Sequence, residues 1–174
     1  MTDMQNLDLL PEEVLKEILL LEEQQKRLET RSEAQDKFMS YVKHVYDGFI
    51  EGTHHRIISK KLERIASGDL KRLIVNMPPR HSKSEFASYL MPSWFLGRNP
   101  KLKIIQATMN TELAVRFGRK VRDLIADPVY REIFPNTDLK PDSQAAGRWE
   151  TSAGGEYFAA GVGAAMTGRG ADLL

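Results

Sequence analysis

The sequence of 174 residues contains no cysteine. This absence excludes disulfide-stabilised folds, thiolate metal sites and cysteine nucleophiles. No apolar run is longer than a few residues, whereas a membrane-spanning helix needs about 20, so we expect no membrane association. The N-terminus is acidic and lacks the basic and apolar regions of a secretory signal. Apolar residues make up 41% and charged residues 28% of the chain, which predicts one globular domain with or without a helical extension.

Charges of opposite sign separate along the chain. Residues 1–36 carry ten acids and four bases, whereas residues 37–174 carry 21 bases and 14 acids. A basic body attracts polyanions such as nucleic acid, but an excess of this size is also usual for a solvated surface. Charge alone therefore leaves nucleic-acid binding open.

Two helices are predicted in the first 52 residues. The segment that Pro11 opens has acids in its first turn and apolar residues at helical spacing, but the heptad period lasts for only about two repeats. A second helix is expected over residues 38–49, with Gly52 ending it. Residues 1–52 are interpreted either as an arm that binds a partner or as a helical cap on the chain's own core.

The remaining residues alternate between helix and strand patterns. The expected order is a helix from Thr53, a strand over Arg72–Met77, a helix from about Lys83, a strand over Lys101–Thr108, a helix over Thr111–Ala126, a hairpin within residues 148–162 and the entry to a strand at the end. This alternation predicts an α/β fold with a mostly parallel sheet flanked by helices. Ligands of such sheets bind at the carboxyl ends of strands, so the loop before Lys83 is the first place to seek chemistry.

That loop reads Met-Pro-Pro-Arg-His-Ser-Lys-Ser over residues 77–84. The phosphate-binding pattern is a glycine, four residues, a second glycine, lysine and then serine or threonine. Lys83 and Ser84 match the invariant pair, while Met77 and Ser82 occupy the two glycine positions. Backbone N–H groups at a helix N-terminus can surround a polyphosphate, Lys83 can reach its β- and γ-phosphates, and the Ser84 hydroxyl can bind Mg²⁺.

Three residues of the loop need separate interpretation. Ser82 stands where glycine often adopts a positive φ. This geometry would cost a serine about 1–2 kcal/mol, which a folded chain can tolerate, so we expect the loop to keep its shape. Arg80 either stabilises charge on a transferred phosphoryl group or is an ordinary solvated or carboxylate-paired arginine. His81 is interpreted as a spacer, and the adjacent His54 and His55 diverge too far on a helix to share a metal.

Taken together, three segments resemble the ATPase domain of the large terminase subunit of tailed bacteriophages. The segments are THHRIISKKLERIASGDLKRLIVNMPPRHSKSE, WFLGRNP and RWETSAGGEYFAAGVGAAMTGRGADLL, between about Thr53 and Leu174. The family commonly has glycine where this chain has Ser82. The resemblance implies a P-loop NTPase fold of the additional-strand class over residues 53–174, with residues 1–52 as a preceding helical arm.

The resemblance also implies a function in viral DNA packaging. Proteins of this family use ATP and Mg²⁺ to drive double-stranded viral DNA into capsids through the portal protein, work with a small terminase subunit, form homo-oligomeric rings and act in the host cytoplasm. The resemblance assigns nucleotide binding to a run of seven residues, namely Pro79, Arg80, His81, Ser82, Lys83, Ser84 and Glu85. Within that run Lys83 and Arg80 are the expected catalytic residues, and Ser84 is the expected metal ligand.

The family pattern continues past GRGADLL with a Walker B strand and, later, a nuclease domain that cuts concatemeric DNA. Since neither is in this sequence, we expect weak nucleotide binding and little or no hydrolysis from these 174 residues. Arg119 or Arg122 could act on a neighbouring subunit's nucleotide, and Arg169 could couple nucleotide and DNA sites or simply occupy a turn. Two other hypotheses remain, namely another P-loop enzyme, such as a helicase-like ATPase or a small kinase, and an interaction fragment that no longer holds nucleotide.

Overall fold

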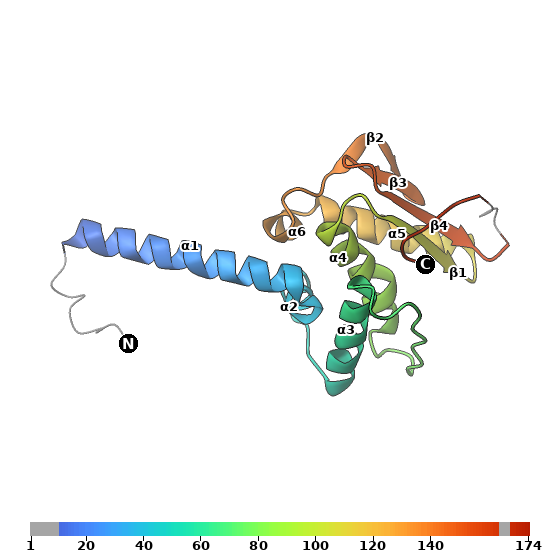
Figure 1. Cartoon of the computed structure of the whole chain (residues 1–174), viewed down its shortest axis with the longest axis horizontal. Helices are drawn as coiled ribbons and strands as arrows, with labels where there is room; N and C mark the ends of the chain where they lie inside the picture. Colours follow the sequence, from blue (N-terminus) through green and yellow to red (C-terminus); the bar gives the residue numbers. More distant parts are fainter. Residues whose placement is uncertain (1–10, 164–167) are drawn as a thin grey trace.

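The computed structural model describes residues 11–163 and 168–174, and these residues form an α/β fold with a long N-terminal helix (Figure 1). The elements in chain order are α1 (Glu12–Asp36), α2 (Phe38–Val45), α3 (Thr53–Ala66), the π-helical segment η2 (Glu85–Leu90), α4 (Met91–Arg98), β1 (Lys103–Thr108), α5 (Thr111–Ala126), α6 (Pro128–Ile133), β2 (Leu139–Ala145), β3 (Arg148–Thr151) and β4 (Glu156–Gly161).

The sheet has the strand order β1-β4-β3-β2. β1 and β4 are parallel, with Ile104 opposite Tyr157, whereas β4 and β3, and β3 and β2, are antiparallel. The sheet is therefore mixed, and the prediction of a mostly parallel sheet is wrong. The structure confirms the predicted hairpin as β3 and β4. The two strands of a hairpin are antiparallel, and the pairing of β2 with β3 adds a second antiparallel pair, so only β1 and β4 run in the same direction. At the other edge, Leu173 forms a parallel bridge to Ile104.

The core lies between the sheet, α5 and the helices α2, α4 and α6, which pack around the C-terminal end of α1. Trp94 and Trp149 are fully buried, and each indole N–H donates to a backbone carbonyl, Trp94 to Ala34 at 3.0 Å and Trp149 to Gly118 at 3.1 Å. Gly118 lets α5 approach the sheet closely, because a Cβ atom there would lie 2.6 Å from the Ala146 carbonyl oxygen. Burial strengthens these polar contacts, because the only alternative for the indole N–H is an unsatisfied donor.

Residues 1–52 combine an extended helix with a packed end. Every residue from Leu19 to Thr30 is exposed, and α1 extends away from the body (Figure 1). From Ala34 onward the chain joins the core, where Phe38, Tyr41 and Val42 are fully buried. The hydroxyls of Tyr41 and Ser93 lie 2.6 Å apart, and burial raises the pKa of Tyr41 well above its ordinary value. The end of this region therefore packs on the body, as a cap would, while most of α1 projects as an arm would.

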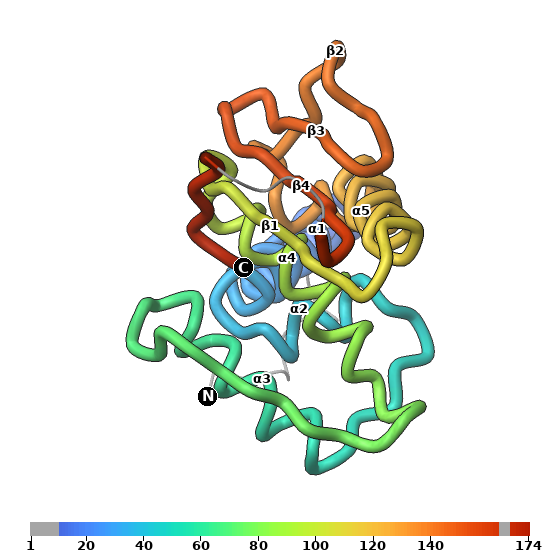
Figure 2. Tube along the Cα trace, turned by 90° about the vertical axis from the view of Figure 1, so that its right-hand side faces the viewer, coloured from blue at the N-terminus to red at the C-terminus, as the bar shows by residue number. Residues whose placement is uncertain are grey.

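The segment predicted as a strand over Arg72–Met77 is not one. It pairs with no described strand, and the trace runs across the molecule apart from the sheet (Figure 2). Its side chains still alternate, since Leu73, Val75 and Met77 are half-buried while Ile74 is 87% exposed. Alternation shows which side chains of the segment are buried, but a β-strand also needs a neighbouring strand that completes its backbone hydrogen bonds. Among the described residues no strand pairs with this segment.

Candidate nucleotide-binding loop

The loop before η2 holds two residues in left-handed backbone geometry. Arg80 has a φ of 64° and Ser82 a φ of 60°, and among the described residues these are the only non-glycine positions with positive φ. The expected left-handed geometry of Ser82 is confirmed. Each such position costs roughly 1–2 kcal/mol, because the Cβ atom crowds the backbone carbonyl. The surrounding structure must hold this loop in place, and strained backbone of this kind concentrates at sites that bind or react.

A helix begins directly after the second left-handed residue. Lys83 and Ser84 form its first turn, and the Phe86 N–H donates to the Ser82 carbonyl at 2.9 Å. The helical conformation continues through η2 into α4, so the segment that starts here is 16 residues long. The first N–H groups of a helix have no partner within it, and the helix dipole adds partial positive charge at this end. The predicted strand before the loop is absent, but the predicted order of tight loop and then helix is present.

Two cations of the loop face solvent without a carboxylate partner. Arg80 and Lys83 are both exposed, and neither forms an ion pair within residues 11–163 and 168–174. Carboxylate pairing of Arg80 does not apply to the described residues, so two interpretations remain, a guanidinium that stabilises phosphoryl charge and an ordinary solvated arginine. The loop therefore combines free backbone donors with two mobile positive charges, which is the chemistry that a polyphosphate needs.

Glu85 is committed to a contact away from the loop. Its two carboxylate oxygens accept from the Lys120 ammonium on α5, at 3.0 and 2.7 Å. Lys120 also lies 4.4 Å from the centroid of the Tyr89 ring, and burial, followed by the Glu85 charge, raises the pKa of Tyr89 to about 12. The pair fastens η2 to α5, so the Glu85 carboxylate is engaged with α5 through both of its oxygens.

Histidines from α3 meet the loop, which the sequence did not predict. The His81 ring donates from Nδ1 to the Pro79 carbonyl at 2.8 Å, and its centroid lies 5.6 Å from that of His54. His55 stacks on Phe86 with ring centroids 5.0 Å apart, and its Nδ1 accepts from the Gly52 N–H. Burial, and then the neighbouring His54, lower the pKa of His55.

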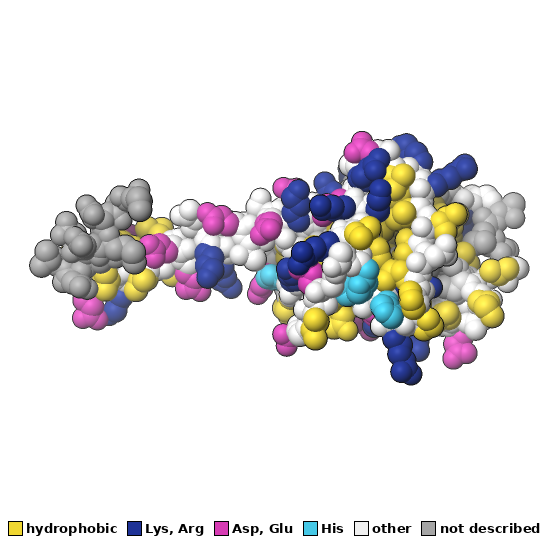
Figure 3. All heavy atoms as spheres, turned by 90° about the horizontal axis from the view of Figure 1, so that it is seen from below, with side chains coloured by type: hydrophobic (Ala, Val, Ile, Leu, Met, Phe, Trp, Pro, Cys, Tyr) yellow, Lys and Arg dark blue, Asp and Glu magenta, His cyan; other side chains and the backbone are white. Residues whose placement is uncertain are grey.

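These contacts fix α3 against the loop and the first turn of its helix. In the space-filling view from below, histidine side chains gather beside apolar ones on this face of the body (Figure 3). The adjacency of His54 and His55 argues against a shared metal but does not by itself predict this packing. Their packing role could have been inferred from the period that places His55, Ser59 and Leu62 on one buried face of α3.

A cavity lies between the segment before the loop and the edge of β1. Its volume is about 860 Å³, and its lining is mixed, with the apolar Leu73, Val75 and Ile104 beside the charged Lys71 and Asp172. Leu73 and Val75 of the predicted strand thus line the same cavity as Ile104 and Ile105 of β1, whereas Ile74 does not. The cavity is separate from the loop, because none of the residues 79–84 contributes to its lining.

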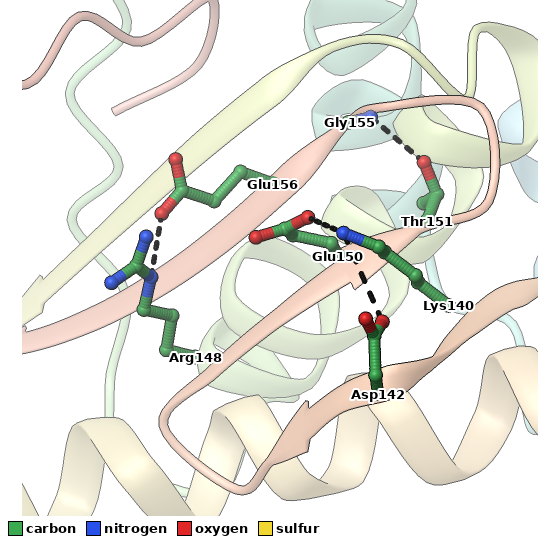
Figure 4. Close-up of polar contacts among 7 residues, drawn as sticks. All are labelled: Lys140, Asp142, Arg148, Glu150, Thr151, Gly155 and Glu156. Atoms are coloured by element: carbon green, nitrogen blue, oxygen red, sulfur yellow. Dashed lines mark hydrogen bonds and ion pairs between the residues drawn. The ribbon is translucent and has the colours of Figure 1, made fainter.

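Strands β2, β3 and β4 carry ion pairs between their side chains (Figure 4). Lys140 pairs with Glu150 at 3.0 Å, and this contact is the main reason why the pKa of Lys140 is raised. Arg148 and Arg169 share one oxygen of Glu156, each at 2.9 Å. The Arg169 guanidinium also lies 4.1 Å from the centroid of the Phe158 ring. Arg169 therefore fastens the last described segment to the sheet, away from the loop.

The arginines considered on α5 differ in their contacts. Arg122 binds Asp123 at 2.7 Å and donates to the Gln144 carbonyl, so its guanidinium is occupied by its own chain. Arg119 is exposed and forms no ion pair with the described residues. Of these two, Arg119 is the one with a guanidinium free to contact another molecule.

None of the helices in the described part of the chain is long and apolar enough to cross a membrane.

Comparisons of the chain with protein-family models, with curated proteins and with solved structures found no match.

Proposed function

We propose that the loop Pro79–Glu85 binds the phosphates of ATP, with Lys83 on the β- and γ-phosphates and Ser84 on Mg²⁺. The observation that carries this proposal is the left-handed geometry of Arg80 and Ser82 directly before an unblocked helix N-terminus. A serine that accepts this strain in place of glycine does so because the loop shape is needed. The free charges of Arg80 and Lys83 supply the neutralisation that a triphosphate requires.

We propose further that the chain acts as the ATPase portion of a phage terminase large subunit with a P-loop NTPase fold. Support comes from the three resembling segments, from the α/β architecture and from the loop at the head of its helix. In that function, ATP hydrolysis moves double-stranded viral DNA, the protein works as a ring with the small terminase subunit and the portal protein, and the site of action is the host cytoplasm.

Binding without steady hydrolysis is the expected behaviour of these residues. Hydrolysis needs a carboxylate that orients water and supports the metal, besides neutralisation of the phosphates. Glu85, the acid within the loop, gives both of its oxygens to Lys120. The described residues also hold no cluster of three or more His, Asp and Glu that could bind a metal by themselves, so Mg²⁺ would arrive with the nucleotide.

The test is equilibrium binding of ATP to the 174-residue chain, with and without Mg²⁺. Lys83→Ala should weaken binding by about 10- to 100-fold, because a charge-assisted contact to phosphate contributes roughly 1.5–3 kcal/mol. Lys101→Ala is the matched control, since Lys101 is exposed in a turn away from the loop, and it should bind as the unchanged chain does. Equal binding by all three proteins would refute the assignment of the loop.

A further inference from the structure

The projecting part of α1 carries apolar side chains that no described residue covers. Leu19, Leu20, Leu21 and Leu28 are each between 55% and 63% exposed, and Val14 is 38% exposed. In the space-filling view the arm stands clear of the body, with charged and apolar side chains both exposed along it (Figure 3). In proteins most of the stability of a helix comes from packing of its apolar face, so this exposed face needs an occupant.

Three of these residues form a stripe that is symmetric about its centre. Val14, Leu21 and Leu28 are spaced by seven residues, so they lie along one side of the helix. If a second copy of α1 runs antiparallel, with the two Leu21 side chains opposite each other, Val14 of each helix faces Leu28 of the other. The stripe is thus complementary to itself under a two-fold axis, which is the requirement for an isologous dimer.

The charges of α1 favour the antiparallel direction. Residues 12–23 have five acids and one base, whereas residues 24–31 have three bases and one acid, and Glu33 and Asp36 follow at the end of the helix. Parallel pairing would place the two acidic halves side by side, and like charges in register repel. Antiparallel pairing places each acidic half along the basic segment of the other helix.

A groove at the base of the arm fits the end of the second helix. It has a volume of about 600 Å³ and lies between α1 and the α6 side of the body. Its lining combines the bases Lys26, Arg27 and Arg31 and the apolar Leu28 and Ile133 with the acids Glu23 and Glu132. In the antiparallel arrangement the acidic first turn of one α1, with Glu12 and Glu13, reaches the two arginines of the other copy's groove. The apolar and basic parts of the groove thus match the helix end that the two-fold axis delivers.

We infer that α1 mediates an antiparallel two-fold dimer of this chain, centred on Leu21. The contact uses Val14, Leu21 and Leu28 as its apolar seam and the groove at Arg27 and Arg31 as its charged ends. The two bodies lie at opposite ends of the paired helices. The dimer goes beyond the proposed ATPase function, because it involves no residue of the loop and needs no nucleotide.

Sedimentation equilibrium of the whole chain tests this dimer. The unchanged chain should show a monomer–dimer equilibrium, and Leu21→Glu should weaken association by about 100-fold or more, since two apolar side chains at the axis become two carboxylates. Leu19→Glu is the matched control, because Leu19 is equally exposed but projects from another side of α1. Glutamate is a good helix former, so neither change should unfold the helix. A monomer at all concentrations up to about 100 μM, or association that both variants weaken equally, would overturn the inference.

Disulfide trapping tests the direction of the pairing, because the chain has no cysteine of its own. Leu21→Cys should form a covalent dimer under mild oxidation, and Leu19→Cys should not. A mixture of Val14→Cys and Leu28→Cys chains should cross-link to each other in preference to themselves. Preferred cross-linking of Val14→Cys to itself would indicate parallel helices and would overturn the antiparallel arrangement.

Discussion

Replacing Ser82 with glycine should stabilise the protein. At a φ of 60° the serine Cβ costs roughly 1–2 kcal/mol, and glycine removes that strain. Glycine also gives the unfolded chain more freedom, which costs about 0.5–1 kcal/mol. The difference lies between no change and a gain of about 1.5 kcal/mol, which for a chain of this size raises the Tm by up to about 6 °C.

Thermal and urea unfolding followed by circular dichroism would measure this gain. Ser84→Gly is the matched control, because Ser84 has a φ of −70° in the first turn of the same helix. There the glycine relieves nothing, and we expect a loss of about 0.5–1 kcal/mol. If Ser82→Gly destabilised the protein as much as Ser84→Gly does, the strained loop geometry, and with it the main support for the phosphate site, would be refuted.

Two further predictions concern stability. Gly118→Ala should lower the free energy of unfolding by about 1–3 kcal/mol through overpacking, since the new Cβ would lie 2.6 Å from the Ala146 carbonyl oxygen. Gly170→Ala is the control and should change stability little, because no described atom lies within 4 Å of its new Cβ. Calorimetry would compare the two variants, and equal Tm values would contradict the packing of α5 on the sheet. Burial holds the pKa of His55 below its ordinary 6.5, so the folded state binds the proton less readily and stability should fall as the pH falls through 6.5. His55→Gln should flatten the urea-unfolding profile between about pH 7.5 and 5, and an unchanged profile would contradict the assigned burial.

The sequence predicted helices and the hairpin well because their signals are local. The apolar period of α5 is set by residues three or four positions apart, and the turn between β3 and β4 is set by two adjacent glycines. The strand β2 was missed because Leu139–Ala145 is polar and contains Pro141, which is typical of an edge strand. On α5 the small residues Ala114 and Gly118 are buried whereas Leu113 is 37% exposed, which an apolar period alone does not predict.

The strand predicted at Arg72–Met77 failed for a non-local reason. Its β-branched residues fit a pleated surface, but pairing depends on which other segment lies beside it, and that information is absent from the segment itself. The loop after it was predicted better, because the positive φ of Ser82 follows from the local demand of the motif. The contacts of His54, His55 and Lys120 with the loop and its helix arise from packing between distant segments, which no spacing rule describes.

Backbone NMR of the 174-residue chain with Mg²⁺ and ATP tests the central claim most directly. The account predicts that the amide signals of residues 82–85 shift most, since their N–H groups surround the phosphates, and that Lys83→Ala removes these shifts. Shifts confined to the cavity that Leu73 and Ile104 line, or no shifts at millimolar nucleotide, would contradict the assignment of the loop as a phosphate-binding site.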